Sequence, residues 1–329
     1  MTEYQAIVPA AGVGTRLKPH THTLPKALIG VAGKPILGHI LDDIARAGIH
    51  KVTVVTGFFA EKVEGYVRAE YGGLNLTFAH QAEQLGLGHA VWTALRERRD
   101  LPSLVLLGDT IVEADLAALL DQPDNAIAVA PTDDPRRFGI VELSGDRIVS
   151  MVEKPADPPS NLAIVGLYLI RDSEALYDAL GGNIEAGVRT KGEFQLTDAL
   201  ARMLEGGTVF CPWEISGWYD CGKPETLLAT NRVLLERDPP PVPAFPDSVV
   251  IAPSHIGRGV ELTGSVVGPY AAVGAGAVIE GSIVRDSIIG AGARLANVHL
   301  DGSLIGENAV IQGRFDRLNL GDDSEASFT

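Results

Sequence analysis

Two cations that follow a loop of small residues are the first side chains in the sequence that could do chemistry. Arg16 carries a planar guanidinium fork and Lys26 a mobile ammonium, and both groups suit phosphate oxygens. The loop has little side-chain bulk, so its backbone N–H groups can approach an anion closely. Its small residues are Ala10, Ala11, Gly12 and Gly14. This composition favours a nucleoside triphosphate site, and a plain glycine turn is the structural alternative.

The loop matches neither of the two common phosphate-binding motifs. The stretch GVGTRL at 12–17 lacks the third glycine of the dinucleotide fingerprint G-x-G-x-x-G. It also lacks the Gly-Lys-Ser/Thr element with which a P-loop opens its helix. We therefore expect a triphosphate cradle of another kind.

Two aspartates that lie far apart in the chain are candidate metal ligands. Asp109 ends the apolar run SLVLLGD, which places it at the end of an expected strand, and Asp220 follows the aromatic pair WY. Mg²⁺ is commonly held by one or two carboxylates, and phosphate oxygens and water fill its other positions. The pair favours a magnesium site beside a phosphorylated substrate, although either residue alone could be an aspartate that caps a loop.

Alternating strands and helices must position these residues. Apolar runs predict strands, and segments with helical spacing of apolar residues lie between them. The expected strands are 6–10, 51–57, 74–80 and 103–109, and the expected helices are 35–48, 60–71 and 88–99. This alternation predicts an α/β fold with parallel strands, in which ligands bind beyond the carboxyl ends of the strands. The loop after the first strand should therefore face the site.

The last part of the chain has a different pattern. The proline-rich stretch DPPPVPAFPD at 238–247 predicts a semi-rigid linker. Beyond it, aliphatic residues recur about every six positions, which is the hexapeptide period of a parallel β-helix. The glycines that follow them on one side of the expected coil are Gly257, Gly274, Gly290 and Gly306, at intervals of 17, 16 and 16. The interval indicates coils of three sides with one side shortened.

Composition and charge narrow the class of protein. The chain has 329 residues and a net charge of -15, which argues against a nucleic acid partner, because nucleic acid binding needs a basic surface. No apolar run approaches the roughly 20 residues of a membrane span. Two cysteines and the absence of a signal-peptide pattern favour a cytoplasmic protein.

The order of several motifs resembles one enzyme family, the sugar-1-phosphate nucleotidyltransferases. The motifs are AAGVGTRLKP with LPKAL, QAEQLGLGHA, LLGD, FGIVE, VEKP, SNLAIVGLY, GEFQLTDAL and WYDCGKPE. The resemblance implies a Rossmann-like mixed sheet, mainly parallel, followed by a left-handed β-helix. We expect a catalytic domain at 1–237, a linker at 238–247 and a β-helix domain at 248–329.

The resemblance also implies a reaction, in which a sugar 1-phosphate attacks the α-phosphate of a nucleoside triphosphate and releases pyrophosphate. The catalytic residues would be Arg16, Lys26, Asp109, Lys154 and Asp220, of which Asp109 and Asp220 would hold Mg²⁺. The nucleotide would be bound by Ala10, Ala11, Gly12, Gly14, Thr15, Gln81 and Gly86. The sugar phosphate would be bound by Gly139, Glu153, Lys154, Val165 and Tyr168.

Several stretches resemble different branches of the family, so the substrates stay open. PPSNLAIVGLY and the repeat-containing C-terminal part most resemble the long-form thymidylyltransferases, which implies dTTP and glucose 1-phosphate. GLGHAV also resembles enzymes that use UTP with glucose 1-phosphate, and VAGKPIL resembles enzymes that use GTP with mannose 1-phosphate. An acyltransferase of the hexapeptide type and a non-catalytic nucleotide-sugar sensor are alternatives from other classes. We expect a homo-oligomer without membrane or nucleic acid partners.

Overall fold

The computed structural model describes residues 2–313, and the chain divides into two units. The first comprises the residues up to Gly30 together with Lys34–Thr230. The second comprises Val31–Gly33 and the chain from Asn231 onward. No helix within residues 2–313 is long and apolar enough to cross a membrane.

One half of the nine-stranded sheet in the first unit is parallel, as predicted. Its strands follow the order β6-β1-β4-β5, and β4, β5 and β6 are each reached through a helix, which is what parallel pairing requires. The strands are β1 (Gln5–Pro9), β4 (Lys51–Thr56), β5 (Asn75–His80) and β6 (Ser103–Leu106). The helices are α1 (Ile36–Arg46), α2 (Ala60–Glu70) and α3 (Leu87–Glu97). Their apolar residues recur at helical spacing, so each helix buries one side against the sheet.

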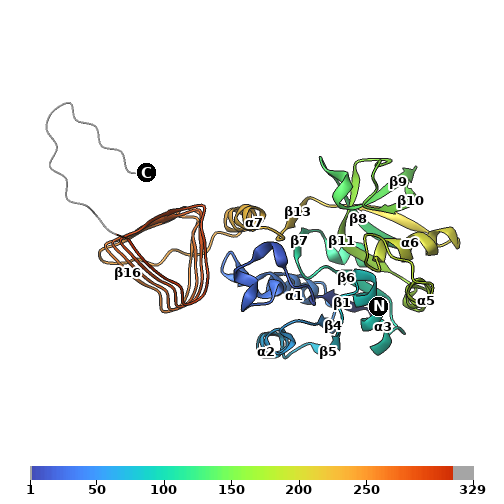
Figure 1. Ribbon diagram of the computed structural model, residues 1–329, viewed down its shortest axis with the longest axis horizontal. Coiled ribbons are helices and arrows are strands. Elements are labelled where there is room, and N and C mark those ends of the chain that lie inside the picture. Colours follow the sequence, from blue (N-terminus) through green and yellow to red (C-terminus); the bar gives the residue numbers. More distant parts are fainter. Residues whose placement is uncertain (1, 314–329) are drawn as a thin grey trace. The chain divides into compact units, whose positions relative to one another are not determined.

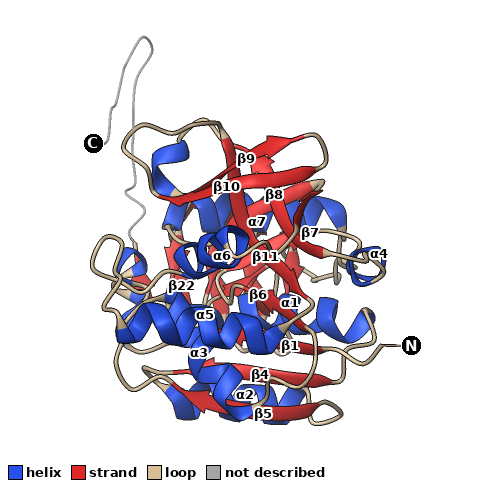
Figure 2. Cartoon of the chain, turned by 90° about the vertical axis from the view of Figure 1, so that its right-hand side faces the viewer, coloured by secondary structure: helices blue, strands red, loops and turns tan. Residues whose placement is uncertain are grey.

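The other half of the sheet is mostly antiparallel, which confirms a mixed sheet. Strand β11 pairs antiparallel with β6, β8 and β9, while β12 runs parallel to β8. The strands are β8 (Asn125–Pro131), β9 (Gly139–Ser144), β10 (Arg147–Glu153), β11 (Leu162–Ile170) and β12 (Phe210–Glu214). The helices beside them are α5 (Ser173–Glu185) and α6 (Leu196–Glu205). Figure 2 shows α3, α5 and α6 together in front of the strands.

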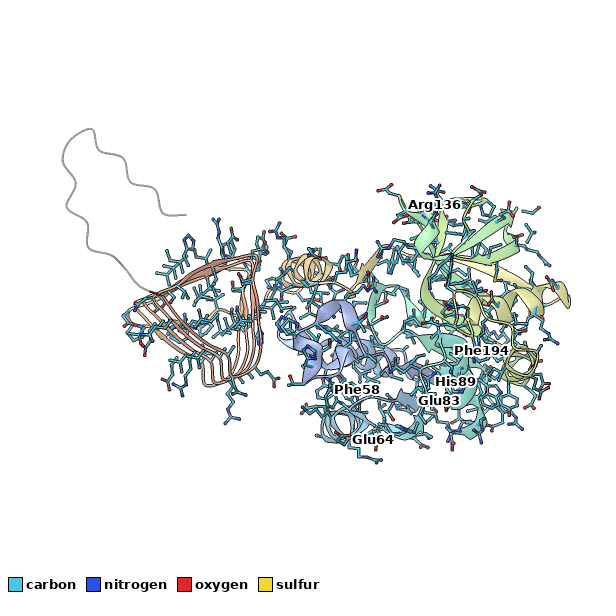
Figure 3. The ribbon with its side chains drawn as sticks, in the orientation of Figure 1. Phe58, Glu64, Glu83, His89, Arg136 and Phe194 are labelled. Atoms are coloured by element: carbon cyan, nitrogen blue, oxygen red, sulfur yellow. The ribbon has the colours of Figure 1, made fainter. Side chains whose placement is uncertain are left out.

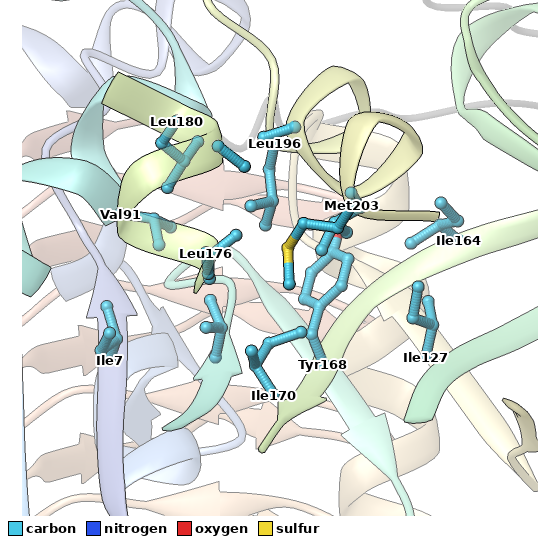
Figure 4. Packing of buried hydrophobic residues seen from close by; sticks show 14 of the residues in the cluster. Ile7, Val91, Ile127, Ile164, Tyr168, Ile170, Leu176, Leu180, Leu196 and Met203 are labelled. Atoms are coloured by element: carbon cyan, nitrogen blue, oxygen red, sulfur yellow. The ribbon is translucent and has the colours of Figure 1, made fainter. Parts of the chain in front are cut away.

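The core of the first unit lies between these three helices and the sheet. Ile7, Val91 and Leu176 are completely buried there, and Met203 fills the space beside the ring of Tyr168 (Figure 4). Because this face is packed with side chains, the ligand site must lie at the ends of the strands.

Short elements complete the first unit and lead into the second. The small strands are β2 (Gly30–Val31), β3 (Lys34–Pro35), β7 (Thr110–Glu113) and β13 (Gly217–Asp220). The remaining helices are α4 (Leu116–Leu120) and α7 (Pro224–Arg237). Single 3-10 turns occur at Thr15–Leu17, His20–His22, Lys26–Leu28 and Pro135–Arg137.

The second unit contains a left-handed parallel β-helix, whose coils have the triangular outline seen in Figure 1. Its first side is formed by β14 (Val249–Val250), β17 (Val266–Val267), β20 (Ile283–Arg285) and β23 (His299–Asp301). Its second side is formed by β15 (His255–Ile256), β18 (Ala272–Val273), β21 (Ile288–Ile289) and β24 (Leu304–Ile305). Its third side is formed by β16 (Glu261–Thr263), β19 (Val278–Glu280), β22 (Arg294–Ala296) and β25 (Val310–Gln312).

The register of the coils confirms the predicted repeat. Ile256 pairs with Val273, Val273 with Ile289, and Ile289 with Ile305, which reproduces the intervals of the sequence. Inward-facing aliphatic side chains form a separate core, in which Val273 and Ile279 are fully buried. Buried serines stabilise the corners, since the Ser265 hydroxyl accepts from the backbone N–H of Ser282 in the next coil at 3.1 Å.

Candidate active site

The small-residue loop after β1 lines a pocket of about 440 Å³, which we call the first pocket. A Cβ on Gly12 would meet no atom within 4 Å, so the backbone here faces open space. The N–H of Ala10 is not available to a ligand, because it donates to the carbonyl of Val55 at 2.9 Å. Gln84 steadies the loop by donating to the carbonyl of Ala11 at 2.7 Å. Ala10 therefore lines the pocket, but its N–H is already used within the sheet.

Gly14 and Thr15 line neither of the pockets described here. Gly14 adopts a left-handed conformation with φ of 66°, and a Cβ on it would lie 2.8 Å from Cβ of Lys26. The Thr21 hydroxyl donates to the carbonyl of Gly14 at 2.9 Å. Gly14 therefore allows the loop to pack closely against the segment that carries Lys26, which a side chain would prevent.

Lys26 and Asp109 form an ion pair at the centre of the site. The Lys26 ammonium lies 2.6 Å from Oδ2 of Asp109, and the side chains are 8% and 43% exposed, respectively. A nearly buried ammonium needs such a partner, because an unpaired charge in this position would be strongly disfavoured. The sequence indicated the two charges separately, but it did not indicate that they neutralise each other.

The far end of the first pocket is built around the start of α3. Gln81 and Gly86 line it, together with Leu87 and Ala90, which were not predicted as site residues. Gly86 has a φ of 111°, and a Cβ on it would lie 2.6 Å from the carbonyl oxygen of Phe194. The glycine therefore lets two distant segments meet here. Figure 3 shows Phe194 and His89 in this region of the first unit.

A second pocket of about 520 Å³ shares part of its wall with the first. The residues common to both are Arg16, Leu107, Asp109 and Lys154, which we call the shared wall. Of the residues predicted from the sequence, Val165 and Asp220 line the second pocket alone. Lys154 adopts a positive φ of 44°, and its N–H donates to the carbonyl of Phe138 at 2.9 Å. This contact holds the start of the lysine side chain at the boundary of the two pockets.

Two adjacent arginines that were not predicted as site residues also line the second pocket. Arg136 and Arg137 form a 3-10 turn immediately before β9, and Figure 3 shows Arg136 on the segment between β8 and β9. The rings of Phe138 and Trp218 pack edge to face beside them, with 4.9 Å between the ring centroids. A pair of arginines within an acidic chain, next to the FGIVE motif, was the signal that could have identified them.

Three residues expected on the sugar side do not line either pocket. Oε2 of Glu153 accepts from the Thr197 hydroxyl at 2.7 Å, and its Oε1 lies 3.1 Å from the Lys154 ammonium. A Cβ on Gly139 would lie 2.8 Å from the same hydroxyl, so Gly139 makes room for this contact. Tyr168 is only 4% exposed and belongs to the core, where burial raises the pKa of its phenol. The face of β11 that carries the ring packs beneath the helices (Figure 4).

The second aspartate approaches the first through strand pairing. Asp220 pairs with Thr110, the neighbour of Asp109, in the antiparallel ladder of β13 and β7. Within residues 2–313 no group of three or more His, Cys, Asp or Glu side chains could hold a metal by itself. Two carboxylates beside a substrate pocket fit a divalent ion whose remaining ligands are phosphate oxygens and water. The donor set therefore fits the expected metal only with substrate present.

Comparisons with known proteins identify the family of the chain. Residues 5–237 match the family model described as Nucleotidyl transferase. The chain is 32% identical to a glucose-1-phosphate thymidylyltransferase of Streptomyces griseus, over 99% of each chain. It is 35% identical to a UTP–glucose-1-phosphate uridylyltransferase of Haloferax volcanii, over 71% of this chain and 97% of the relative.

A solved structure of UDP-glucose pyrophosphorylase with UDP-glucose shares the fold, with a TM-score of 0.62 and 23% identity. The match covers 72% of this chain and all of that one. This structure shows the fold alone, whereas the family model and the nearly full-length relative show the family. The chain therefore belongs to the nucleotidyl transferase family, as a sugar-1-phosphate nucleotidyltransferase.

Proposed function

We propose that the protein transfers a thymidylyl group from dTTP to glucose 1-phosphate and releases pyrophosphate. The nearly full-length similarity to a glucose-1-phosphate thymidylyltransferase supports this choice of substrates. The observation that carries the mechanism is the shared wall, which places Arg16, Asp109 and Lys154 on both pockets at once. Two substrates in adjoining pockets would react across such a wall.

In the proposed reaction, a phosphate oxygen of the sugar phosphate forms a bond to the α-phosphorus of the nucleotide. The bond from that phosphorus to the bridging oxygen breaks, and pyrophosphate leaves with the electron pair. No protein nucleophile is needed, so catalysis rests on positioning and on stabilising negative charge. Arg16 and Lys26 would hold the triphosphate, and Lys154 would hold the phosphate of the sugar.

The nucleotide would occupy the first pocket. Ala11 and Gly12 would offer backbone to its phosphates, Ala10 would contribute to the wall, and Gln81 with Gly86 would contact the base. Gly14 and Thr15 would act indirectly, because they shape the loop without lining the pocket.

The sugar phosphate would occupy the second pocket, beside Val165 and the two arginines of the turn before β9. Glu153 would act on the sugar phosphate indirectly, because it contacts Lys154. Gly139 would support it by leaving room for the contact between Glu153 and Thr197. Tyr168 is left out of the proposed binding site, since its ring lies in the core.

Asp109 and Asp220 would hold Mg²⁺ together with phosphate oxygens of the nucleotide. When bound, the ion neutralises phosphate charge and helps to align the reacting groups. Asp109 already faces a cation, since Lys26 contacts it. We infer that this ammonium compensates the carboxylate until the substrate arrives.

The β-helix would serve assembly of a homo-oligomer or regulation. Both pockets are lined by residues of the first unit alone. We keep 1–237, 238–247 and 248–329 as the proposed catalytic domain, linker and β-helix domain. Residues 314–329 of the last range lie outside the described residues.

UTP is the second candidate nucleotide, because of the similarity to the uridylyltransferase of Haloferax volcanii. Thymine and uracil differ by one methyl group, and a pocket discriminates such a group by only about 1 to 3 kcal/mol. The test is release of pyrophosphate from dTTP, UTP, GTP, ATP and CTP, each with glucose 1-phosphate and with mannose 1-phosphate. We expect dTTP with glucose 1-phosphate to give the highest kcat/KM. Release confined to another pair would reassign the substrates, and no release with any pair would contradict the proposal.

A further inference from the structure

The amide of Gln81 is held in one orientation at the base end of the first pocket. The residue is 5% exposed and lines the pocket. Its Nε2 donates to the carbonyl oxygen of Gly86 at 3.1 Å and lies 3.0 Å from Nδ1 of His89. Both contacts engage the nitrogen of the amide, so Oε1 is the atom that the side chain can offer to a ligand.

The hydrogen-bonding groups of Gly86 and His89 determine the orientation of the Gln81 amide. A carbonyl oxygen can only accept, so the amide nitrogen and not its oxygen must face Gly86. Nδ1 of His89, which faces the same nitrogen, must then act as the acceptor. His89 is consequently neutral, with its proton on Nε2.

The backbone around His89 keeps the ring in this place. His89 lies in the first turn of α3, and its carbonyl accepts from the Thr93 hydroxyl at 2.8 Å. The centroid of its ring lies 5.9 Å from that of the Trp92 ring. The N–H of Gly88 donates to the carbonyl of Phe194 at 2.8 Å, which ties the start of the helix to a second segment. The acceptor for Gln81 is therefore part of a fixed arrangement.

We propose that His89 is a positioning residue for base recognition, which turns the Gln81 oxygen toward the pocket and so selects bases that carry a ring N–H. Thymine, uracil and guanine have such a donor, whereas the corresponding ring nitrogen of cytosine and adenine is an acceptor. If cytosine or adenine faced the Gln81 oxygen, two acceptors would meet and neither would form a hydrogen bond. The pocket should therefore bind these bases much more weakly. This inference rests on the proposed function, because it needs a nucleotide base in the first pocket.

Protonation of His89 should disturb the arrangement. Nδ1 would then be a donor facing the amide nitrogen, while the Gly86 carbonyl still requires that nitrogen. Burial lowers the pKa of His89; the Glu83 carboxylate raises it, and Arg189 and Arg96 lower it. The net direction keeps the ring neutral near pH 7. Base recognition should therefore be present above the pKa of His89 and be lost as the pH falls through it.

Two substitutions separate this role from a purely structural one. His89→Gln keeps an acceptor for Gln81 but does not titrate, and His89→Leu removes the acceptor. His50→Leu is the matched control, because His50 is exposed and lines neither pocket. The full-length protein is assayed with dTTP and with dCTP at saturating glucose 1-phosphate, from about pH 5.5 to about pH 8.5. The KM for glucose 1-phosphate and the melting temperature are measured in parallel.

We expect His89→Leu to raise the KM for dTTP about tenfold and to narrow the preference for dTTP over dCTP by a similar factor. His89→Gln should restore both values to within about threefold of the wild type, and its KM for dTTP should rise less on acidification. The KM for glucose 1-phosphate should be unchanged in both variants.

The inference is overturned if His89→Leu keeps the preference for dTTP and the pH profile of the wild type, or if His89→Gln is as impaired as His89→Leu. Failure of the proposed function looks different, because the wild-type protein itself would then release no pyrophosphate from dTTP. A loss shared by His89→Leu and the His50→Leu control would also count against the inference.

Discussion

The two pockets of the first unit share a wall but are built differently. Outside the shared wall, the first is lined mainly by backbone and uncharged residues, such as Gly12, Gln81 and Gln84, with Lys26 and Glu193 as its charged side chains. The second is formed by Arg136, Arg137 and aromatic rings beside the antiparallel half of the sheet. The uncharged end of the first suits a base whose shape and polar edge must be recognised, and its cations suit phosphates, whereas the arginines of the second suit a phosphate alone.

Because the two pockets have separate linings beyond the shared wall, the effects of substitutions should divide between the two substrates. A change in the shared wall should affect the use of both substrates, because those residues face both pockets. A change confined to one pocket should affect one substrate. A change in the β-helix core should affect neither, if catalysis belongs to the first unit.

The largest effect is expected in the shared wall, at Asp109. Asp109→Asn removes the carboxylate proposed to hold the metal and leaves the nearly buried Lys26 ammonium without its anionic partner. We expect kcat to fall by about 10²- to 10³-fold at saturating levels of both substrates. Steady-state assays at several Mg²⁺ concentrations would measure this loss.

Asp115→Asn is the matched control for that experiment. Asp115 caps α4 by accepting from the N–H of Ala118 at 3.0 Å, and it lines neither pocket. The same chemical change there should leave kcat within about twofold. If Asp109→Asn were as active as Asp115→Asn, Asp109 would have no place in the proposed mechanism.

The smallest effect on turnover is expected in the β-helix. Ile289 is 1% exposed in its core, so Ile289→Ala should cost about 2 to 5 kcal/mol of stability. Ile283→Ala is the same change at a side chain that is 45% exposed, and it should cost much less. Thermal unfolding of both variants would measure the difference. At 25 °C (298 K) both should keep the KM values of the wild type, and a changed KM in Ile289→Ala alone would contradict the division of roles.

The parts of the fold that follow local periodicity could be predicted from the sequence. Ile256, Val273 and Ile289 recur once per coil, so their stacking follows from spacing alone. The parallel strands follow from apolar runs separated by amphipathic helices. The antiparallel half of the sheet was harder to predict from the sequence, because the pairing of β11 with three other strands depends on contacts between distant segments.

The site was predicted best where function depends on residue type near the end of a strand. Arg16, Lys26 and Asp109 were predicted as site residues, and all three line the first pocket. What could not be predicted depends on direction and partners in space. Tyr168 was expected at the sugar, but the face of β11 that carries it packs into the core. The role inferred for His89 depends on the orientation of an amide, which sequence does not show.

The most direct test of the account compares the two pockets in one experiment. Gln81→Leu alters only the first pocket, and the double variant Arg136→Gln/Arg137→Gln alters only the second. Arg99→Gln is the control, since Arg99 pairs with Glu174 and lines neither pocket. The measurement is the KM for dTTP and the KM for glucose 1-phosphate in each variant.

The account predicts opposite patterns. Gln81→Leu should raise the KM for dTTP about tenfold or more and leave that for glucose 1-phosphate unchanged. The arginine variant should raise the KM for glucose 1-phosphate about tenfold and leave that for dTTP unchanged. If both variants raised the same KM, or each raised both equally, the assignment of one substrate to each pocket would be contradicted.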